Sequence, residues 1–93
     1  MRRIVIIEDE FYAAQHLSKL ITNLEYEVKG IYHSGEEFLD ETDWEFDAAI
    51  VDVFLADEMT GFDVAKHMNQ NAKPFIFLTA NQDEATVKKA TEL

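Results

Sequence analysis

The sequence predicts an α/β fold with a doubly wound parallel sheet, and two observations support this prediction. First, three short runs without a charged residue occur at residues 4–7, 48–51 and 75–78. Continuous apolar runs of this kind are typical of strands that are buried on both faces. Second, segments with helical periodicity separate the runs, and strands that alternate with helices form parallel sheets with right-handed crossovers. The expected order is four strand–helix pairs, (βα)4.

A helix with one buried stripe is expected after the first strand, residues 4–7. Apolar residues recur there at intervals of three and four positions, at Ala13, Leu17, Leu20, Ile21 and Leu24. Phe11 and Tyr12 are expected to pack at the start of this helix. Residues 27–33 then alternate between polar and apolar side chains, which predicts a half-exposed strand near an edge of the sheet.

A capping box opens the second helix, because Ser34 can cap it while Glu37 reaches back to the start. Trp44 and Phe46 precede the second apolar run and are expected to cover the lower edge of the core.

The last two helices are predicted from their first residues and from their apolar spacing. Thr60 or Gly61 opens the third helix, and Asn81 or Asp83 opens the fourth. The residues expected to face inward are Phe62, Ala65 and Met68 in the third helix, and Val87 and Ala90 in the fourth.

The composition limits the classes of function. A chain of 93 residues makes one small domain, and 47% apolar with 29% charged residues is ordinary for a globular protein. The chain has no cysteine, so it can form no disulfide and no thiolate metal site, which fits a cytoplasmic location. The first apolar run is too short for a signal peptide or a membrane span. The net charge of −11 argues against binding of DNA or RNA, because phosphates attract clusters of Lys and Arg.

Acidic and hydroxyl side chains occur at the ends of three of the predicted strands. Glu8 and Asp9 follow the first run, Asp52 follows the second, and Thr79 follows the third. Ligands of doubly wound sheets bind beyond the carboxyl ends of the strands, at a switch point in strand order. We therefore expect these side chains to meet at one edge of the sheet.

Neighbouring carboxylates repel one another, so one of them takes up a proton unless a cation compensates the charge. Oxygen ligands without His or Cys suit a hard ion such as Mg²⁺. Beside such an ion, Asp52 can act as a nucleophile and form an acyl phosphate, and Thr79 can donate a hydrogen bond to a phosphoryl oxygen.

Each of these residues also has an ordinary structural interpretation. Glu8, Asp9 or Glu10 can cap the helix that follows, and Thr79 can be a hydroxyl at a strand end. The coincidence of three strand ends favours a site. His16, His33 and His67 lie on different elements without ligand spacing, so they are expected to be at the surface or half-buried.

Several stretches together resemble the receiver domain of two-component response regulators, and the resemblance runs from residue 4 to about residue 93. They are Glu8-Asp9-Glu10, Asp52, Gly61 and Thr79-Ala80. The resemblance implies a flavodoxin-like fold and a phosphoacceptor role for Asp52, which would receive its phosphoryl group from a sensor histidine kinase. Such a domain is a signalling module rather than a turnover enzyme.

The resemblance also implies further site residues. Glu8, Asp9, Asp52 and the backbone carbonyl of Phe54 would hold Mg²⁺. Thr79 would sense the phosphoryl group, and the small Ala80 would leave access to it. Phe54 and Asn81 match positions that tune the lifetime of the phosphoryl group.

The chain departs from the commonest receiver pattern in two places. The run from Phe54 to Gly61 lacks a proline and is one residue longer than usual, which is similar to receivers that precede LytTR-type DNA-binding domains. The family's fifth strand, with its lysine, and fifth helix would fall beyond Leu93. Residues 1–93 are therefore expected to form an incomplete receiver domain that lacks the last strand and helix. Residues 75–78 would then be an exposed apolar edge that invites pairing into a homo-oligomer.

Two other functions stay open at this point. One is an interaction or oligomerisation module that works without phosphorylation, which the exposed edge and the missing lysine favour. The other is a Mg²⁺-dependent phosphohydrolase with Asp52 as nucleophile. Some such enzymes have a second Asp two residues after the nucleophile, where this chain has Phe54, which argues against this function.

Overall fold

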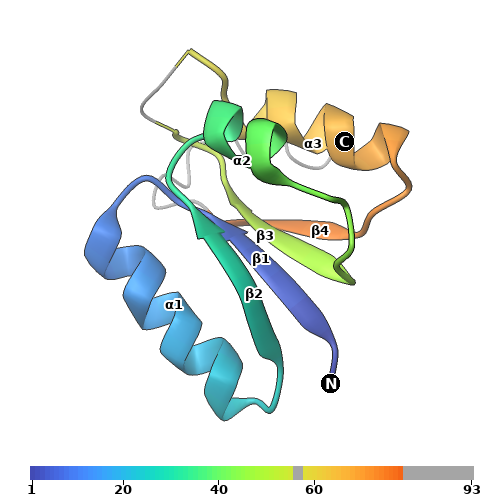
Figure 1. Ribbon diagram of the computed structural model, residues 1–93. Coiled ribbons are helices and arrows are strands. Elements are labelled where there is room, and N and C mark those ends of the chain that lie inside the picture. Colours follow the sequence, from blue (N-terminus) through green and yellow to red (C-terminus); the bar gives the residue numbers. More distant parts are fainter. Residues whose placement is uncertain (56–57, 79–93) are drawn as a thin grey trace.

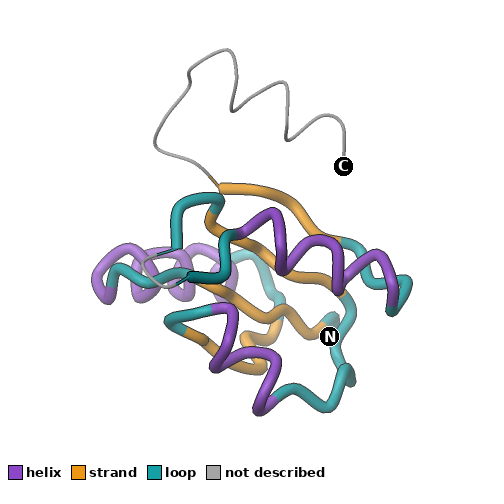
Figure 2. The backbone as a smooth tube through the Cα atoms, turned by 90° about the horizontal axis from the view of Figure 1, so that it is seen from above, coloured by secondary structure: helices purple, strands orange, loops and turns teal. Residues whose placement is uncertain are grey.

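The computed structural model describes residues 1–55 and 58–78 (Figures 1 and 2). Strands and helices alternate along this part of the chain, in the order β1 (Arg3–Ile7), α1 (Phe11–Asn23), β2 (Glu27–Tyr32), α2 (Gly35–Glu41), β3 (Ala48–Asp52), α3 (Gly61–Gln70) and β4 (Phe75–Leu78). The fourth helix, expected from Asn81 or Asp83, lies outside the described residues. None of the described helices combines the length and the apolar character that a membrane span requires.

The strands form one sheet in the order β2-β1-β3-β4, and every neighbouring pair is parallel. The helix α1 lies on one face of this sheet, and α2 and α3 lie on the other (Figure 1). The predicted doubly wound, flavodoxin-like sheet is confirmed. The prediction of an edge strand at residues 27–33 is also confirmed, because β2 pairs only with β1 among the described strands.

The main core lies between the sheet and the helices α2 and α3. Val5, Ile7 and Val51 point into it from the central strands and are almost completely buried. Phe38 of α2 stands at its centre and makes edge contacts with the rings of Tyr32, Trp44 and Phe46 at 5.2, 5.4 and 6.0 Å. The core position expected for Trp44 and Phe46 is confirmed.

The apolar stripe of α1 is narrower than its sequence predicts. Ala14 is buried and Leu17 and Ile21 are half-buried, but Leu20 and Leu24 are exposed. Since α1 contacts mainly β1 and β2 among the described strands, only the side of α1 towards these strands is buried.

The expectation that Phe11 and Tyr12 pack at the start of α1 is wrong in its main point, because 56% and 78% of these residues are exposed. Within α1 the buried position is Ala14, so the first residues of the helix do not cover the core. Their rings contact each other at 5.5 Å, and Phe11 also stacks on His33 at 6.4 Å.

Side chains cap the helices at the end of the sheet where the strands terminate. Ser34 accepts a hydrogen bond from the Glu37 amide at 3.0 Å, so the predicted cap is confirmed, but the Glu37 side chain does not return a bond to the Ser34 amide and the predicted capping box is incomplete. At the start of α3, Thr60 and Asp63 form a complete capping box, in which each side chain accepts a bond from the backbone of the other. The caps fix where α2 and α3 begin and so set the loops around that end of the sheet.

Gly61 closes the loop between β3 and α3 directly against the strand. Its amide donates to the Val53 carbonyl at 3.1 Å. A Cβ atom at this position would lie 2.8 Å from the Val53 Cα and would also clash with the Asp52 carbonyl. Backbone atoms cannot move aside as the end of a side chain can, so only glycine fits here.

We expect Gly61→Ala to lower the free energy of unfolding by about 1–3 kcal/mol, because the loop must move away from β3 to admit the methyl group. Urea denaturation measures the change. The control is Gln70→Ala on the exposed end of the same helix, which should stay within about 0.5 kcal/mol of the wild type. A Gly61→Ala protein as stable as this control would contradict the close approach.

Candidate functional site

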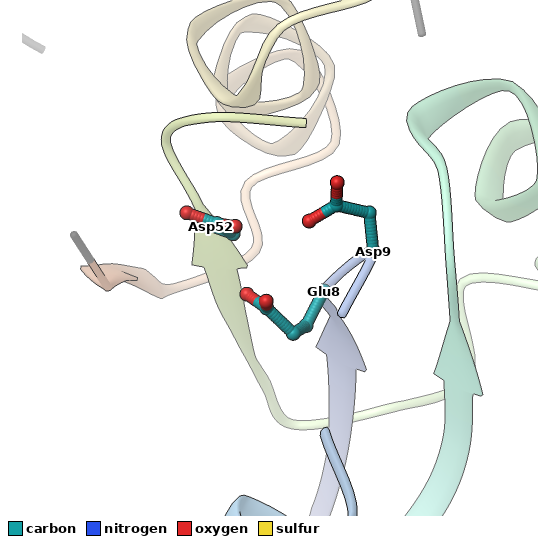
Figure 3. A group of neighbouring side chains, drawn as sticks. All are labelled: Glu8, Asp9 and Asp52. Atoms are coloured by element: carbon teal, nitrogen blue, oxygen red, sulfur yellow. The ribbon is translucent and has the colours of Figure 1, made fainter. Parts of the chain in front are cut away.

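The register of two central strands places three carboxylates together. Ile7 of β1 is paired with Val51 of β3, so the next residues, Glu8 and Asp52, emerge side by side at the carboxyl ends of these strands. Asp9 follows Glu8 and completes the group. One oxygen from each of the three carboxylates lies within 4.8 Å of the others (Figure 3). We call Glu8, Asp9 and Asp52 the acidic cluster.

The acidic cluster is held by the packing of the strands beneath it. Ile7 and Val51, the residues immediately before Glu8 and Asp52, are fully buried in the core. Glu8 itself is only 6% exposed, and Asp9 and Asp52 are half-buried. Figure 3 shows Glu8 and Asp9 extending from the end of β1 towards Asp52.

Local hydrogen bonds orient two of these carboxylates. The Phe54 amide donates to Oδ1 of Asp52 at 3.1 Å, which fixes the rotation of that carboxylate. The Glu10 amide donates to Oε1 of Glu8 at 3.2 Å. Each bond uses one oxygen of its carboxylate and directs the group into the cluster.

The electrostatics of the cluster favour one bound proton. Burial, followed by the hydrogen bond and the charge of Asp52, raises the pKa of Glu8 from its ordinary 4.5 to about 8. Burial also raises the pKa of Asp52, and the charge of Asp9 adds to this effect. Near neutral pH the metal-free cluster therefore retains a proton between Glu8 and Asp52.

The structure brings together the three carboxylates that the sequence predicts, and it separates them from Glu10. Glu10 is the N-cap of α1 and accepts hydrogen bonds from the amides of Tyr12 and Ala13 at 3.1 and 2.6 Å. The capping interpretation is thus correct for Glu10, whereas Glu8 and Asp9 face Asp52.

The structure describes only some of the other predicted site residues. Phe54 lies two residues beyond Asp52, the last residue of β3; its amide donates a hydrogen bond to the Asp52 carboxylate, and its side chain is exposed. Thr79, Ala80 and Asn81 lie outside the described residues. The histidines are at the surface or half-buried, as expected.

One contact of the site has no signal in the sequence. The Nδ1 atom of His33 lies 3.1 Å from the backbone carbonyl of Glu8. This contact arises because β2 pairs with β1, and residues that lie 25 positions apart in the chain meet beside the cluster.

The chemistry of the donors fits a hard divalent cation. Carboxylate oxygens are the ligands that Mg²⁺ prefers, and the cluster offers one from each of three residues within 4.8 Å. A cation there would replace the shared proton and would allow all three groups to be ionised. Such a cation would also leave Asp52, at the end of its strand, as a charged carboxylate beside a Lewis acid.

Comparisons with known proteins give a consistent result. The family model of the response regulator receiver domain matches residues 4–93. The transcriptional regulatory protein CrdR of Helicobacter pylori is 27% identical over 95 residues, which cover 99% of this chain and 44% of CrdR. The chain therefore spans less than half the length of this curated relative.

Two solved structures show the same likeness. The signal receiver domain of a modulated diguanylate cyclase from Desulfovibrio desulfuricans G20 has a TM-score of 0.87 and 31% identity, over 99% of this chain and 75% of that one. The response regulator protein TrrA from Thermotoga maritima, solved in complex with Mg²⁺-BeF, has a TM-score of 0.80 and 26% identity, over 88% of this chain and 72% of that one.

The raised pKa of Glu8 makes the stability of the metal-free protein depend on pH. Between pH 4.5 and about 8 the folded state binds a proton at Glu8 that the unfolded state releases, so stability falls as the pH rises through this range. We expect Glu8→Gln, which stays neutral, to melt higher than the wild type at pH 8.5. The gain should be about 4–8 °C, which corresponds to about 1 kcal/mol in a domain of this size.

Glu25→Gln provides the control, because Glu25 is exposed and its replacement removes one carboxylate, as Glu8→Gln does. Thermal unfolding in EDTA should show the two variants converging towards pH 5 and diverging towards pH 8.5. Parallel melting curves of Glu8→Gln and Glu25→Gln across this range would contradict the retained proton.

Proposed function

The chain belongs to the response regulator receiver domain family, and from this premise we propose that Asp52 accepts a phosphoryl group from a sensor histidine kinase. The proposed Mg²⁺ ligands are Glu8, Asp9, Asp52 and the backbone carbonyl of Phe54. The observation that supports the proposal is the convergence of three carboxylates within 4.8 Å at the ends of β1 and β3.

Bound Mg²⁺ would supply positive charge that compensates the carboxylates and the incoming phosphoryl oxygens. The residues of the chain would bind the cation and orient the nucleophile. Glu8 and Asp9 would hold the cation beside Asp52, and the Phe54 amide holds the Asp52 carboxylate in one orientation. The response regulator TrrA was solved in complex with Mg²⁺-BeF, which supports this choice of cation.

The proposed step is a transfer between two nucleophiles. A carboxylate oxygen of Asp52 forms a bond to phosphorus while the bond between phosphorus and the histidine nitrogen of the kinase breaks. The electron pair of that bond returns to the imidazole, and Asp52 carries an acyl phosphate. In this proposal Thr79 then donates a hydrogen bond to the phosphoryl group, and Ala80 leaves room for it.

As a receiver domain the chain is a signalling domain and not a classical enzyme. A cytoplasmic location is part of the proposal. So is the absence of nucleic-acid binding by these 93 residues, since their net charge is −11. The likeness to receivers that precede LytTR-type domains stays a prediction.

Incubation with Mg²⁺ and acetyl phosphate, followed by intact mass measurement, tests the phosphoacceptor. We expect the wild type to gain one phosphoryl group, and Asp52→Asn to gain none, because its amide is not a nucleophile. Removal of Mg²⁺ with EDTA should also abolish the gain. Asp40→Asn, at an exposed site on α2, is the matched control and should behave as the wild type. A folded wild type that gains no mass, or an Asp52→Asn protein that does, would contradict the proposal.

A second function, association without phosphorylation, is favoured by the surface around β4. Within the described sheet β4 is an edge strand, and Ile76 and Leu78 are 63% and 36% exposed. A hollow of about 190 Å³ beside it is lined mainly by apolar residues, namely Ile4, Ile21, Tyr26, Ala48, Ala49, Ile50, Pro74, Phe75 and Ile76. An apolar edge next to an apolar hollow is suited to pairing with another copy of the chain.

If this second function holds, sedimentation should show a dimer whose population does not change with acetyl phosphate. Ile76→Lys should then lower the association constant at least about tenfold, because a charged side chain on an edge strand opposes pairing. Gln70→Lys adds the same charge on the exposed end of α3 and should have little effect. A monomer at all concentrations, or a dimer that is insensitive to Ile76→Lys, would exclude association through this edge.

A further inference from the structure

The connection that leads from β2 into the first turn of α2, residues 33–36, contacts both segments that carry the acidic cluster. On the β1 side, the Glu8 amide donates to the Tyr32 carbonyl at 2.9 Å, and the Glu8 carbonyl faces Nδ1 of His33 at 3.1 Å. A carbonyl can only accept, so Nδ1 of His33 is the donor. Both polar groups of the Glu8 backbone are therefore held from one side, and the Phe11 ring stacks on the imidazole.

The same connection reaches the loop between β3 and α3. Oε1 of Glu36 accepts a hydrogen bond from the Met59 amide at 3.0 Å. Gly35, immediately before it, packs so closely that a Cβ atom would lie 2.7 Å from Sδ of Met59 and 2.8 Å from Cγ2 of Val64. A hydrogen bond and close packing thus hold the first turn of α2 against the end of that loop.

The position of Met59 bears directly on Asp52. Two residues after Met59, Gly61 donates its amide to Val53 and packs against the Asp52 carbonyl with no space for a side chain. The hydrogen bond of Glu36 therefore acts on the backbone that borders Asp52, as the hydrogen bond of His33 acts on the backbone of Glu8.

We propose that His33 and Glu36 are positioning residues, which set the separation between Glu8, immediately after β1, and Asp52 at the end of β3. The inference rests on the proposed Mg²⁺ role of the acidic cluster and extends it to residues that do not touch the ion. Mg²⁺ demands near-ideal octahedral geometry with short bonds to oxygen, so a small change in this separation weakens binding. Partners that hold the ligands of a metal typically contribute 10–100-fold to its affinity.

Two variants at each position test the hydrogen bond: His33→Asn and Glu36→Gln keep it, whereas His33→Gln and Glu36→Met remove it. The amide nitrogen of Asn reaches the place of the His Nδ1 atom, whereas that of Gln reaches the place of Nε2, and both lose the stacking of the imidazole on Phe11. Gln in place of Glu36 keeps an oxygen acceptor, whereas Met of similar length has none. His33 is exposed and Glu36 is half-buried at the start of its helix, so we expect all four variants to fold.

We expect His33→Gln and Glu36→Met to bind Mg²⁺ about tenfold more weakly than the wild type in calorimetric titration. His33→Asn and Glu36→Gln should bind Mg²⁺ with an affinity within about twofold of that of the wild type. The metal-free variants should all melt at similar temperatures. In Glu36→Met the Met59 amide should also exchange its hydrogen at least about tenfold faster, with or without Mg²⁺.

The outcomes separate this inference from the proposed function. If the wild type binds Mg²⁺ and both members of each pair bind it equally well, the positioning role is overturned and the Mg²⁺ site stands. If the Met59 amide exchanges equally fast in Glu36→Met and Glu36→Gln, the role of Glu36 is overturned whatever the metal does. If the folded wild type binds no Mg²⁺, both the proposed function and the inference fail.

Discussion

The parallel pairing of β1 with β3 is the constraint on which the site depends. The register that pairs Ile7 with Val51 gives Glu8 and Asp52 adjacent places at the end of the sheet, and burial of the two apolar residues makes this register costly to change. Repulsion among the carboxylates of Glu8, Asp9 and Asp52 opposes this arrangement. Packing prevails, and the cost appears as the raised pKa values of Glu8 and Asp52, which are caused mainly by burial and then by the charges of neighbouring carboxylates.

The surrounding structure turns this strained arrangement into a defined site. The cap at Glu10 starts α1 immediately after the cluster, and Gly61 returns the chain closely against the end of β3. The connection after β2 contacts both sides through His33 and Glu36. A cluster held in this way needs a proton or a cation, and in the proposed function a divalent cation beside Asp52 serves phosphoryl transfer.

The sequence predicts the sheet well because each central strand is buried on both faces, and this requires continuous apolar runs such as residues 4–7. Asp52 stands out for the same reason, as an acid that ends such a run. The sequence cannot separate Glu10 from Glu8, since an acid after a strand suits a cap as well as a ligand. It also cannot predict the contact of His33 with Glu8, which depends on how β2 pairs with β1, or the exposure of Leu20, which depends on how α1 lies on the sheet.

The central claim is that the acidic cluster holds one proton that Mg²⁺ displaces. Calorimetric titration with Mg²⁺ at pH 7, in two buffers of different ionisation enthalpy, counts the protons released on binding. The account predicts close to one proton released for each Mg²⁺ bound, because Glu8 with a pKa of about 8 is mostly protonated at this pH. Mg²⁺ binding without proton release would contradict the account.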